Sequence, residues 1–417
     1  MRRPGRHRKK RARITIPRIG WRPAVTILVA GIGAYFSFAH SIAAITASSS
    51  PNLALRFSPG NAAALASKAD ERMADTGHPA RPITLFSMAQ HSLRNEPTNP
   101  RAIRIAAVAQ ELLGHDARAS QLYQLSNRFS RRELGNQLFL LEERVAAGDG
   151  VGALRQYDVI LRTSPSGQAT LFPILSSALE DPAIRAEFSN IARAQPLWLK
   201  QFILFVLDQG KGQADLALAL AEAGGLPADP SYATYENALF TQLIEARNFP
   251  ALEAYARSVK ATPLYALKFM PPGTKGRFQP LTWQAMQPTG IGAAIESTNQ
   301  RTAGKIYVSA DPDERGVAAR KLIVVKPGRY TFEAVQAISA SGRDAAMQWQ
   351  AICAQQQTIL WTSPAESRLG RIIVSQSFDV PEACTALWID LNVAGGASEG
   401  GLEAIVKSAA LRGSVGQ

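Results

Sequence analysis

The feature that most constrains this chain is a run of 25 residues without Lys, Arg, Asp or Glu, from Pro23 to Ala47, directly after a basic N-terminus. As a helix this run would be about 37 Å long, which exceeds the roughly 30 Å hydrocarbon core of a bilayer. We therefore expect residues 23–47 to form a transmembrane helix. A cleaved signal peptide is the alternative, because Ala43 and Ala47 end small-residue cleavage sites, although the apolar core of such peptides is usually only about 7–15 residues long.

The charge distribution predicts which side of the membrane each part occupies. Residues 1–22 contain ten Lys or Arg and no acid, and the first acidic residue is Asp70. Basic segments beside a membrane helix stay in the cytoplasm, so we expect the 1–22 tail to be cytoplasmic and the chain after residue 47 to lie outside. An Ala- and Arg-rich composition is typical of bacteria, which predicts a single-pass inner-membrane protein whose bulk is periplasmic.

The net charge of +13 does not indicate a nucleic-acid binder once it is divided along the chain. Ten of these charges precede residue 23, and the remaining 395 residues carry only +3. Nucleic-acid binding requires a basic patch on a folded domain or a long arm, whereas this cluster adjoins the apolar run. The cluster favours contact with anionic lipid, so the membrane is an expected partner and nucleic acid is not.

Residues 61–270 are rich in Ala and Leu at helical spacing, interrupted by Pro and Gly, and follow a short linker at 48–60. Three residue types recur there at an interval of 34 residues: Gly114 and Gly148, Ala119 and Ala153, and Tyr123 and Tyr157. This period, with a Gly break, a small contact residue and an aromatic, resembles the tetratricopeptide repeat family. The resemblance implies an α-solenoid of stacked helix pairs whose groove binds a protein partner, and the number of repeats stays open.

Past Gly276, after a break at 271–273, the apolar pattern changes to a period of two, which predicts a β-domain over 277–412. Eight strands are expected: Lys305–Ala310, Arg320–Val325, Arg329–Ile338, Met347–Ala354, Thr358–Thr362, Arg371–Val380, Ala386–Val393 and Glu403–Leu411. Short strands separated by turn residues favour a two-sheet sandwich. The turn and strand at 326–332 resemble jelly-roll domains of the galactose-binding and carbohydrate-binding type. The expected fold class is multidomain: one transmembrane helix, an all-α helical-repeat solenoid and an all-β sandwich.

The chain offers little for catalysis. Its histidines are His7, His40, His78, His91 and His115, so the β-domain has none for a Ser-His-Asp triad or a metal site. No nucleophile elbow, phosphate-binding loop, dinucleotide fingerprint or Cys-x-x-Cys motif is present. The acidic cluster at 311–314 is typical of a turn between strands, with a calcium loop as the alternative. We expect no catalytic residue, no metal and no cofactor.

Strand alternation divides residues 386–393 into two faces. One face carries Leu387, Ile389 and Leu391, and the other carries Trp388, Asp390 and Asn392. A sugar platform needs an aromatic ring that stacks on C–H groups and polar groups that bind hydroxyls. We therefore expect Trp388, Asp390 and Asn392 to be an exposed, ligand-facing patch. The alternative is that this face packs against the helical domain or at an edge. Trp349 shares an apolar face and is expected in the core.

Cys353 and Cys384 are the only cysteines in the chain. Outside the cytoplasm, a single pair of cysteines in one domain is typical of a disulfide, which we expect here. Two buried free thiols are the alternative.

These observations lead to three hypotheses of function. The first is a non-enzymatic, membrane-anchored periplasmic scaffold, in which the solenoid binds a protein and the sandwich binds a second partner, such as an envelope glycan. Such an architecture suits the assembly or export of envelope polysaccharide or exopolysaccharide. A carbohydrate-binding module protein is the first alternative. A glycan hydrolase or lyase that uses paired carboxylates is the second.

Overall fold

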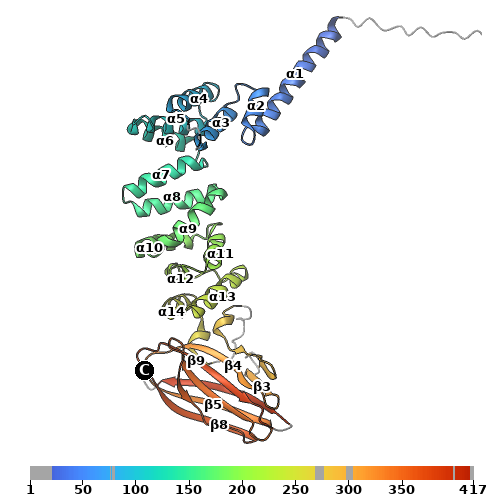
Figure 1. Ribbon diagram of the computed structural model, residues 1–417, viewed down its shortest axis with the longest axis vertical. Helices are drawn as coiled ribbons and strands as arrows, with labels where there is room; N and C mark the ends of the chain where they lie inside the picture. Colours follow the sequence, from blue (N-terminus) through green and yellow to red (C-terminus); the bar gives the residue numbers. More distant parts are fainter. Residues whose placement is uncertain are drawn as a thin grey trace, which may run out of the picture. The chain divides into compact units, whose positions relative to one another are not determined.

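The computed structural model describes residues 21–75, 77, 80–267, 277–296, 304–397 and 400–413. The chain divides into two compact units, Met1–Ala146 and Ala147–Gln417. Figure 1 shows helices in the first unit and helices followed by strands in the second. The expected order of an apolar helix, a helical region and a C-terminal sandwich is confirmed.

Helix α1 (Trp21–Thr46) covers most of the run expected to cross the membrane, and its residues Val25–Thr46 are long and apolar enough to do so. That it spans a membrane stays a prediction. Ala43, near its C-terminal end, is buried in a small cluster with Ala47, Ala54 and Ala64. The last two belong to helices α2 (Pro51–Phe57) and α3 (Ala62–Ala74). The segment expected as a linker therefore contains a helix that packs against the end of α1.

Asparagine side chains cap the N-termini of two helices of the first unit. Asn61 Oδ1 accepts a hydrogen bond from Ala64 N at 2.9 Å before α3, and Asn99 Oδ1 accepts one from Ala102 N at 3.1 Å before α5. Each helix packs against the one before it as far as α7. These helices are α4 (Pro82–Asn95), α5 (Pro100–Glu111), α6 (Asp116–Phe129) and α7 (Leu134–Ala146).

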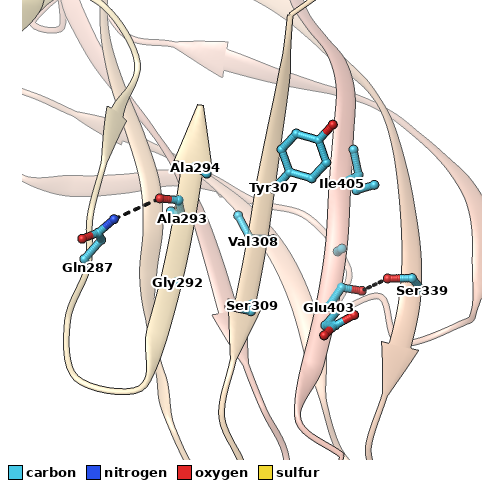
Figure 2. Close-up of a pocket in the computed structure, with 11 residues that line it drawn as sticks. Gln287, Gly292, Ala293, Ala294, Tyr307, Val308, Ser309, Ser339, Glu403 and Ile405 are labelled. Atoms are coloured by element: carbon cyan, nitrogen blue, oxygen red, sulfur yellow. Dashed lines mark hydrogen bonds between the residues drawn. The ribbon is translucent and has the colours of Figure 1, made fainter. Parts of the chain in front are cut away.

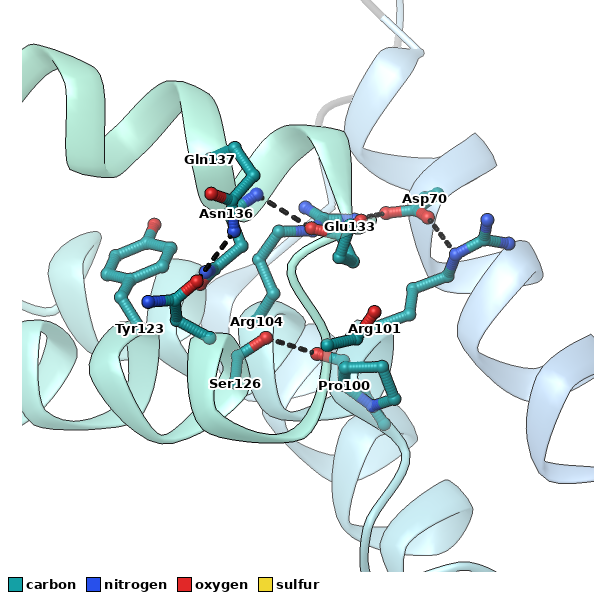
Figure 3. A network of polar contacts seen from close by, with 12 residues as sticks. Asp70, Pro100, Arg101, Arg104, Tyr123, Ser126, Glu133, Asn136 and Gln137 are labelled. Atoms are coloured by element: carbon teal, nitrogen blue, oxygen red, sulfur yellow. Dashed lines mark hydrogen bonds and ion pairs between the residues drawn. The ribbon is translucent and has the colours of Figure 1, made fainter. Parts of the chain in front are cut away.

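A network of charged side chains ties α3, α5 and the start of α7 together (Figure 3). The side chain of Arg104 is only 10% exposed, and it pairs with Asp70 and, at 3.0 Å, with Glu133. Arg101 donates to Ser67 Oγ at 2.7 Å. The Arg104–Asp70 and Arg101–Ser67 pairs each join residues 34 apart. The interval found in the sequence is therefore also an interval of contact between neighbouring helices.

The six residues of the 34-residue pattern have matching local surroundings within their own units. Both glycines follow a helix end with φ of +76° and +71°, a conformation that favours glycine. Both alanines are buried, the first tyrosine is buried, and the second tyrosine is half-buried. They are Gly114, Ala119, Tyr123, Gly148, Ala153 and Tyr157. Membership of the tetratricopeptide family stays a prediction.

The second unit begins with further short helices, two of which, α10 and α13, start at a proline after an Asp cap. Asp181 and Asp229 accept hydrogen bonds from the first-turn amides of the helices that follow them. The elements are α8 (Gly150–Thr163), η1 (Pro165–Gly167), α9 (Gln168–Ala178), α10 (Pro182–Arg193), α11 (Leu199–Gln209), α12 (Gln213–Glu222), α13 (Pro230–Glu245), α14 (Phe249–Ser258), η2 (Thr262–Tyr265) and η3 (Gln279–Leu281).

The strands form two antiparallel sheets, ordered β1-β4-β9-β6-β7 and β2-β3-β10-β5-β8. Successive strands mostly cross from one sheet to the other, as in a jelly roll. The strands are β1 (Gln284–Ala285), β2 (Ile291–Glu296), β3 (Lys305–Ala310), β4 (Arg315–Val324), β5 (Gly328–Ser341), β6 (Ala346–Cys353), β7 (Thr358–Thr362), β8 (Gly370–Val380), β9 (Ala386–Ala394) and β10 (Leu402–Gly413). The eight expected strands correspond to β3–β10; β1 and β2 were not expected.

The core of the sandwich lies between the two sheets. Trp349 is fully buried there, as expected, and its indole N–H donates to Gln336 Oε1 at 2.8 Å. Its ring lies 5.0 Å from that of Phe332 on the opposite sheet. Cys353 and Cys384 are both buried and are joined by a disulfide. The bond links the end of β6 to the turn before β9.

Polar contacts join the last helices to the sandwich within the second unit. Arg277, before η3, donates to Glu236 Oε1 of α13 at 3.0 Å. Lys321 of β4 is fully buried, and its Nζ donates to the carbonyls of Pro263 at 2.7 Å and Leu281 at 2.8 Å. One amine therefore fixes η2 and η3 to the sheet.

Candidate functional site

Strand β9 does not provide the exposed patch expected from its sequence. Alternation does place Trp388, Asp390 and Asn392 opposite the core leucines, but Trp388 is only 8% exposed and Asp390 only 1%, while Asn392 is half-buried. The Arg320 guanidinium lies 4.7 Å from the Trp388 ring centre and donates to both Asp390 oxygens, at 2.7 and 3.1 Å. The expectation that this face is exposed is wrong, and the alternative of packing is what the structure shows.

The physical reason lies in the side chains and elements that surround this face of β9. Strand β9 is the central strand, between β4 and β6, so side chains from both neighbours flank each of its residues. Leu322 and Ile352 lie directly across from Trp388 on the two sides. Elements η2 and η3 also contact β4. Period-two alternation shows which residues share a face, but it does not show what covers that face.

The other sheet offers an open surface. A trough of about 470 Å³ lies on its outer face, across β2, β3, β10 and the neighbouring part of β5 (Figure 2). This volume is within the usual range of small-molecule sites, about 300–1,000 Å³. The trough is a candidate binding site.

Small side chains make the trough hollow. Gly292, Ala294 and Ser309 lie on the outer face of β2 and β3, where large side chains would fill the space. Gly292 leaves room for its cross-strand neighbour, because a Cβ there would collide with Ser309 Oγ. Because these outward side chains are small, β2 and β3 form a shallow region at one edge of the sheet.

Among the described residues that line the trough, Tyr307 is the one with an aromatic side chain. It is 40% exposed, lies directly across from Ile405 of β10, and donates from its hydroxyl to Glu296 Oε2 at 3.4 Å. Figure 2 shows the Tyr307 ring and Ile405 side by side on neighbouring strands. An exposed ring beside an aliphatic side chain provides an apolar platform for a ligand.

Polar groups lie two residues away from Tyr307 and Ile405 on β3 and β10. Glu403 is exposed on β10 and pairs in register with Ser309 of β3. Ser339 of β5 sits at a bulge, and its hydroxyl donates to the Glu403 carbonyl at 3.2 Å. Gln287, on the loop before β2, donates to the Ala293 carbonyl at 3.1 Å. The platform is therefore followed by a carboxylate and hydroxyl groups that can bind hydroxyl or amino groups of a ligand.

This arrangement is suited to binding. The chain supplies no histidine to this domain, and the described residues hold no group of three or more His, Cys, Asp or Glu that could bind a metal. Tyr307 lies within an expected strand, so its side of the sheet could be read from the sequence. The trough itself could not, because it depends on β2, which was not expected, and on β10 and β5, which follow far along the chain.

Comparison with known proteins gives similarity at the level of architecture. No protein-family model and no curated protein sequence matches the chain. Among solved structures, the CBM22-1 xylan-binding domain of Paenibacillus barcinonensis Xyn10C is 9% identical, covering 32% of this chain and 87% of that domain with a TM-score of 0.24. A family 16 carbohydrate-binding module is 11% identical over 33% and 92% of the two chains, with a TM-score of 0.23.

A third similar structure is a carbohydrate-binding module from Cellvibrio mixtus lichenase 5A in complex with cellotriose. It is 12% identical over 32% of this chain and 96% of that module, with a TM-score of 0.20. The strands of this chain thus resemble carbohydrate-binding modules. At these identities and scores the similarity carries no argument about what the trough binds.

Proposed function

We propose that this chain is a non-catalytic glycan-binding protein whose trough on β2, β3, β10 and β5 takes a short stretch of polysaccharide. The observation that carries the proposal is the pairing of the half-exposed Tyr307 ring with hydroxyl and carboxylate groups two residues along, in an open hollow. A pyranose ring presents C–H groups on one face and hydroxyls at its edge, so it matches such a surface.

We further propose that α1 holds the protein in the bacterial inner membrane with its bulk in the periplasm. The ten basic residues before residue 23, against no acidic residue, support that orientation. A periplasm-dependent reporter fused after Gln417 should be active, and a cytoplasm-dependent one should be silent. The opposite result would reverse the topology.

The helical region would give the protein its second partner. Helix pairs that contact each other at an interval of 34 residues form extended surfaces suited to docking another protein. In this proposal the protein is a membrane-anchored scaffold that links a glycan to a protein during assembly or export of envelope polysaccharide.

The trough is tested by the change Tyr307→Ala in the full-length protein in detergent. Loss of one stacking ring should weaken binding to the oligosaccharides that the wild type retains on a glycan array by roughly ten-fold or more. Tyr265→Ala is a matched control, because Tyr265 is 41% exposed and lies outside the trough. Equal binding by both variants, or no retained glycan, would contradict the proposal.

A further inference from the structure

The charge of the trough narrows the class of glycan. Of the described side chains that line it, Glu403 is the only charged one. Glu403 is exposed and lines the trough, and Ser339 donates to its backbone carbonyl and not to its carboxylate (Figure 2). A sugar above Ser309 and Glu403 would therefore meet one negative charge.

The basic side chains nearest the trough on β3 and β10 lie away from Glu403. Lys305 and Lys407 are two residues beyond Tyr307 and Ile405, in the direction opposite to Glu403. Lys305 is directly across from Glu296, whose carboxylate offsets its charge. Arg371 is on β8, outside the trough. None of these three basic side chains lines the hollow.

From this distribution we infer that the trough selects a glycan that carries free amino groups, with an ammonium bound at Glu403. The inference rests on the proposed glycan binding and specifies its substrate class. A uronate or other anionic sugar would place like charges together, and an N-acetylated sugar would lack the positive charge. A partly or fully N-deacetylated amino-sugar polymer carries ammonium groups that can pair with the Glu403 carboxylate.

The size of the preference follows from Coulomb's law. Two unit charges about 4 Å apart in water attract by about 1 kcal/mol, which corresponds to about five-fold in Kd. The preference should weaken with added salt, because the carboxylate is exposed and ionic screening acts over about 8–10 Å.

The test compares two probes of one linkage, a β-1,4-linked glucosamine hexamer and its fully N-acetylated counterpart, by calorimetry on the full-length protein in detergent. At about pH 6, where much of the amine is protonated, the wild type should bind the glucosamine hexamer about five-fold more tightly. Glu403→Gln should bring the ratio of the two Kd values close to one. Glu382→Gln is the control, because Glu382 is exposed in the turn before β9, and it should keep the wild-type ratio.

The possible outcomes distinguish the preference for an amino sugar from glycan binding itself. If Tyr307→Ala weakens both hexamers but the wild type does not prefer the amine, or Glu403→Gln leaves the preference unchanged, the inference is overturned and glycan binding stands. If neither hexamer binds, or Tyr307→Ala binds both as the wild type does, the trough is not a site for these glycans and the inference is overturned with it.

Discussion

The stability of the second unit should depend on pH through Lys321. This amine is fully buried and donates hydrogen bonds to the backbone carbonyls of Pro263 and Leu281. Burial disfavours the charged form and lowers the pKa of Lys321 from 10.5 to about 7. Above about pH 7 the folded state thus holds mostly the neutral amine, which still donates hydrogen bonds.

The sign and size of the effect follow from linkage. Between about pH 7 and 10.5 the unfolded lysine binds a proton that the folded one does not, so the free energy of unfolding rises with pH. The slope is about 1.4 kcal/mol per pH unit, which gives about 2–3 kcal/mol between about pH 7 and 9. Below about pH 7 both states are protonated and the slope from this group disappears.

The assay is urea unfolding of the full-length protein in detergent, followed by tryptophan fluorescence at several pH values between about 6 and 9. Lys321→Met should remove this contribution. Between about pH 7 and 9 the free energy of unfolding of the wild type should therefore rise by about 2–3 kcal/mol relative to that of the variant. Lys326→Met is the control, because Lys326 is exposed and its variant should follow the wild-type profile. Parallel curves for wild type and Lys321→Met would refute the reasoning.

Two further changes test the sandwich. Trp388→Ala should lower the free energy of unfolding by about 3–5 kcal/mol in the same assay, as expected for a buried aromatic, and a loss below about 1 kcal/mol would show that the ring is exposed in solution. Reduction of the disulfide between Cys353 and Cys384, 31 residues apart, should cost about 3–4 kcal/mol. Mass spectrometry of unreduced peptides checks the bond, and two freely alkylated thiols in protein made in its own compartment would contradict it.

The trough illustrates how a candidate site depends on distant parts of the chain. Tyr307 and Ser309 alternate on an expected strand, so their common face was predictable. Their neighbours Glu403 and Ile405 come about a hundred residues later, and nothing local in the sequence pairs β3 with β10. At Trp388 the sequence showed correctly which residues share a face, but it did not show that neighbouring side chains bury that face.

The sequence by itself determined the order of parts. Three patterns show this order: an uncharged run long enough for a bilayer, a 34-residue interval of Gly, Ala and Tyr, and a later period of two. Each is a local spacing of residue types, and local spacing indicates whether a segment forms a helix or a strand. Tertiary structure alone decided which faces are open. Arg320 covers Trp388, and Lys321 is buried against carbonyls from residues 58 and 40 positions away. Burial depends on the neighbours that the fold brings together, which is why the candidate site lies on the outer face of the β2-β3-β10-β5-β8 sheet and not on the outer face of β9.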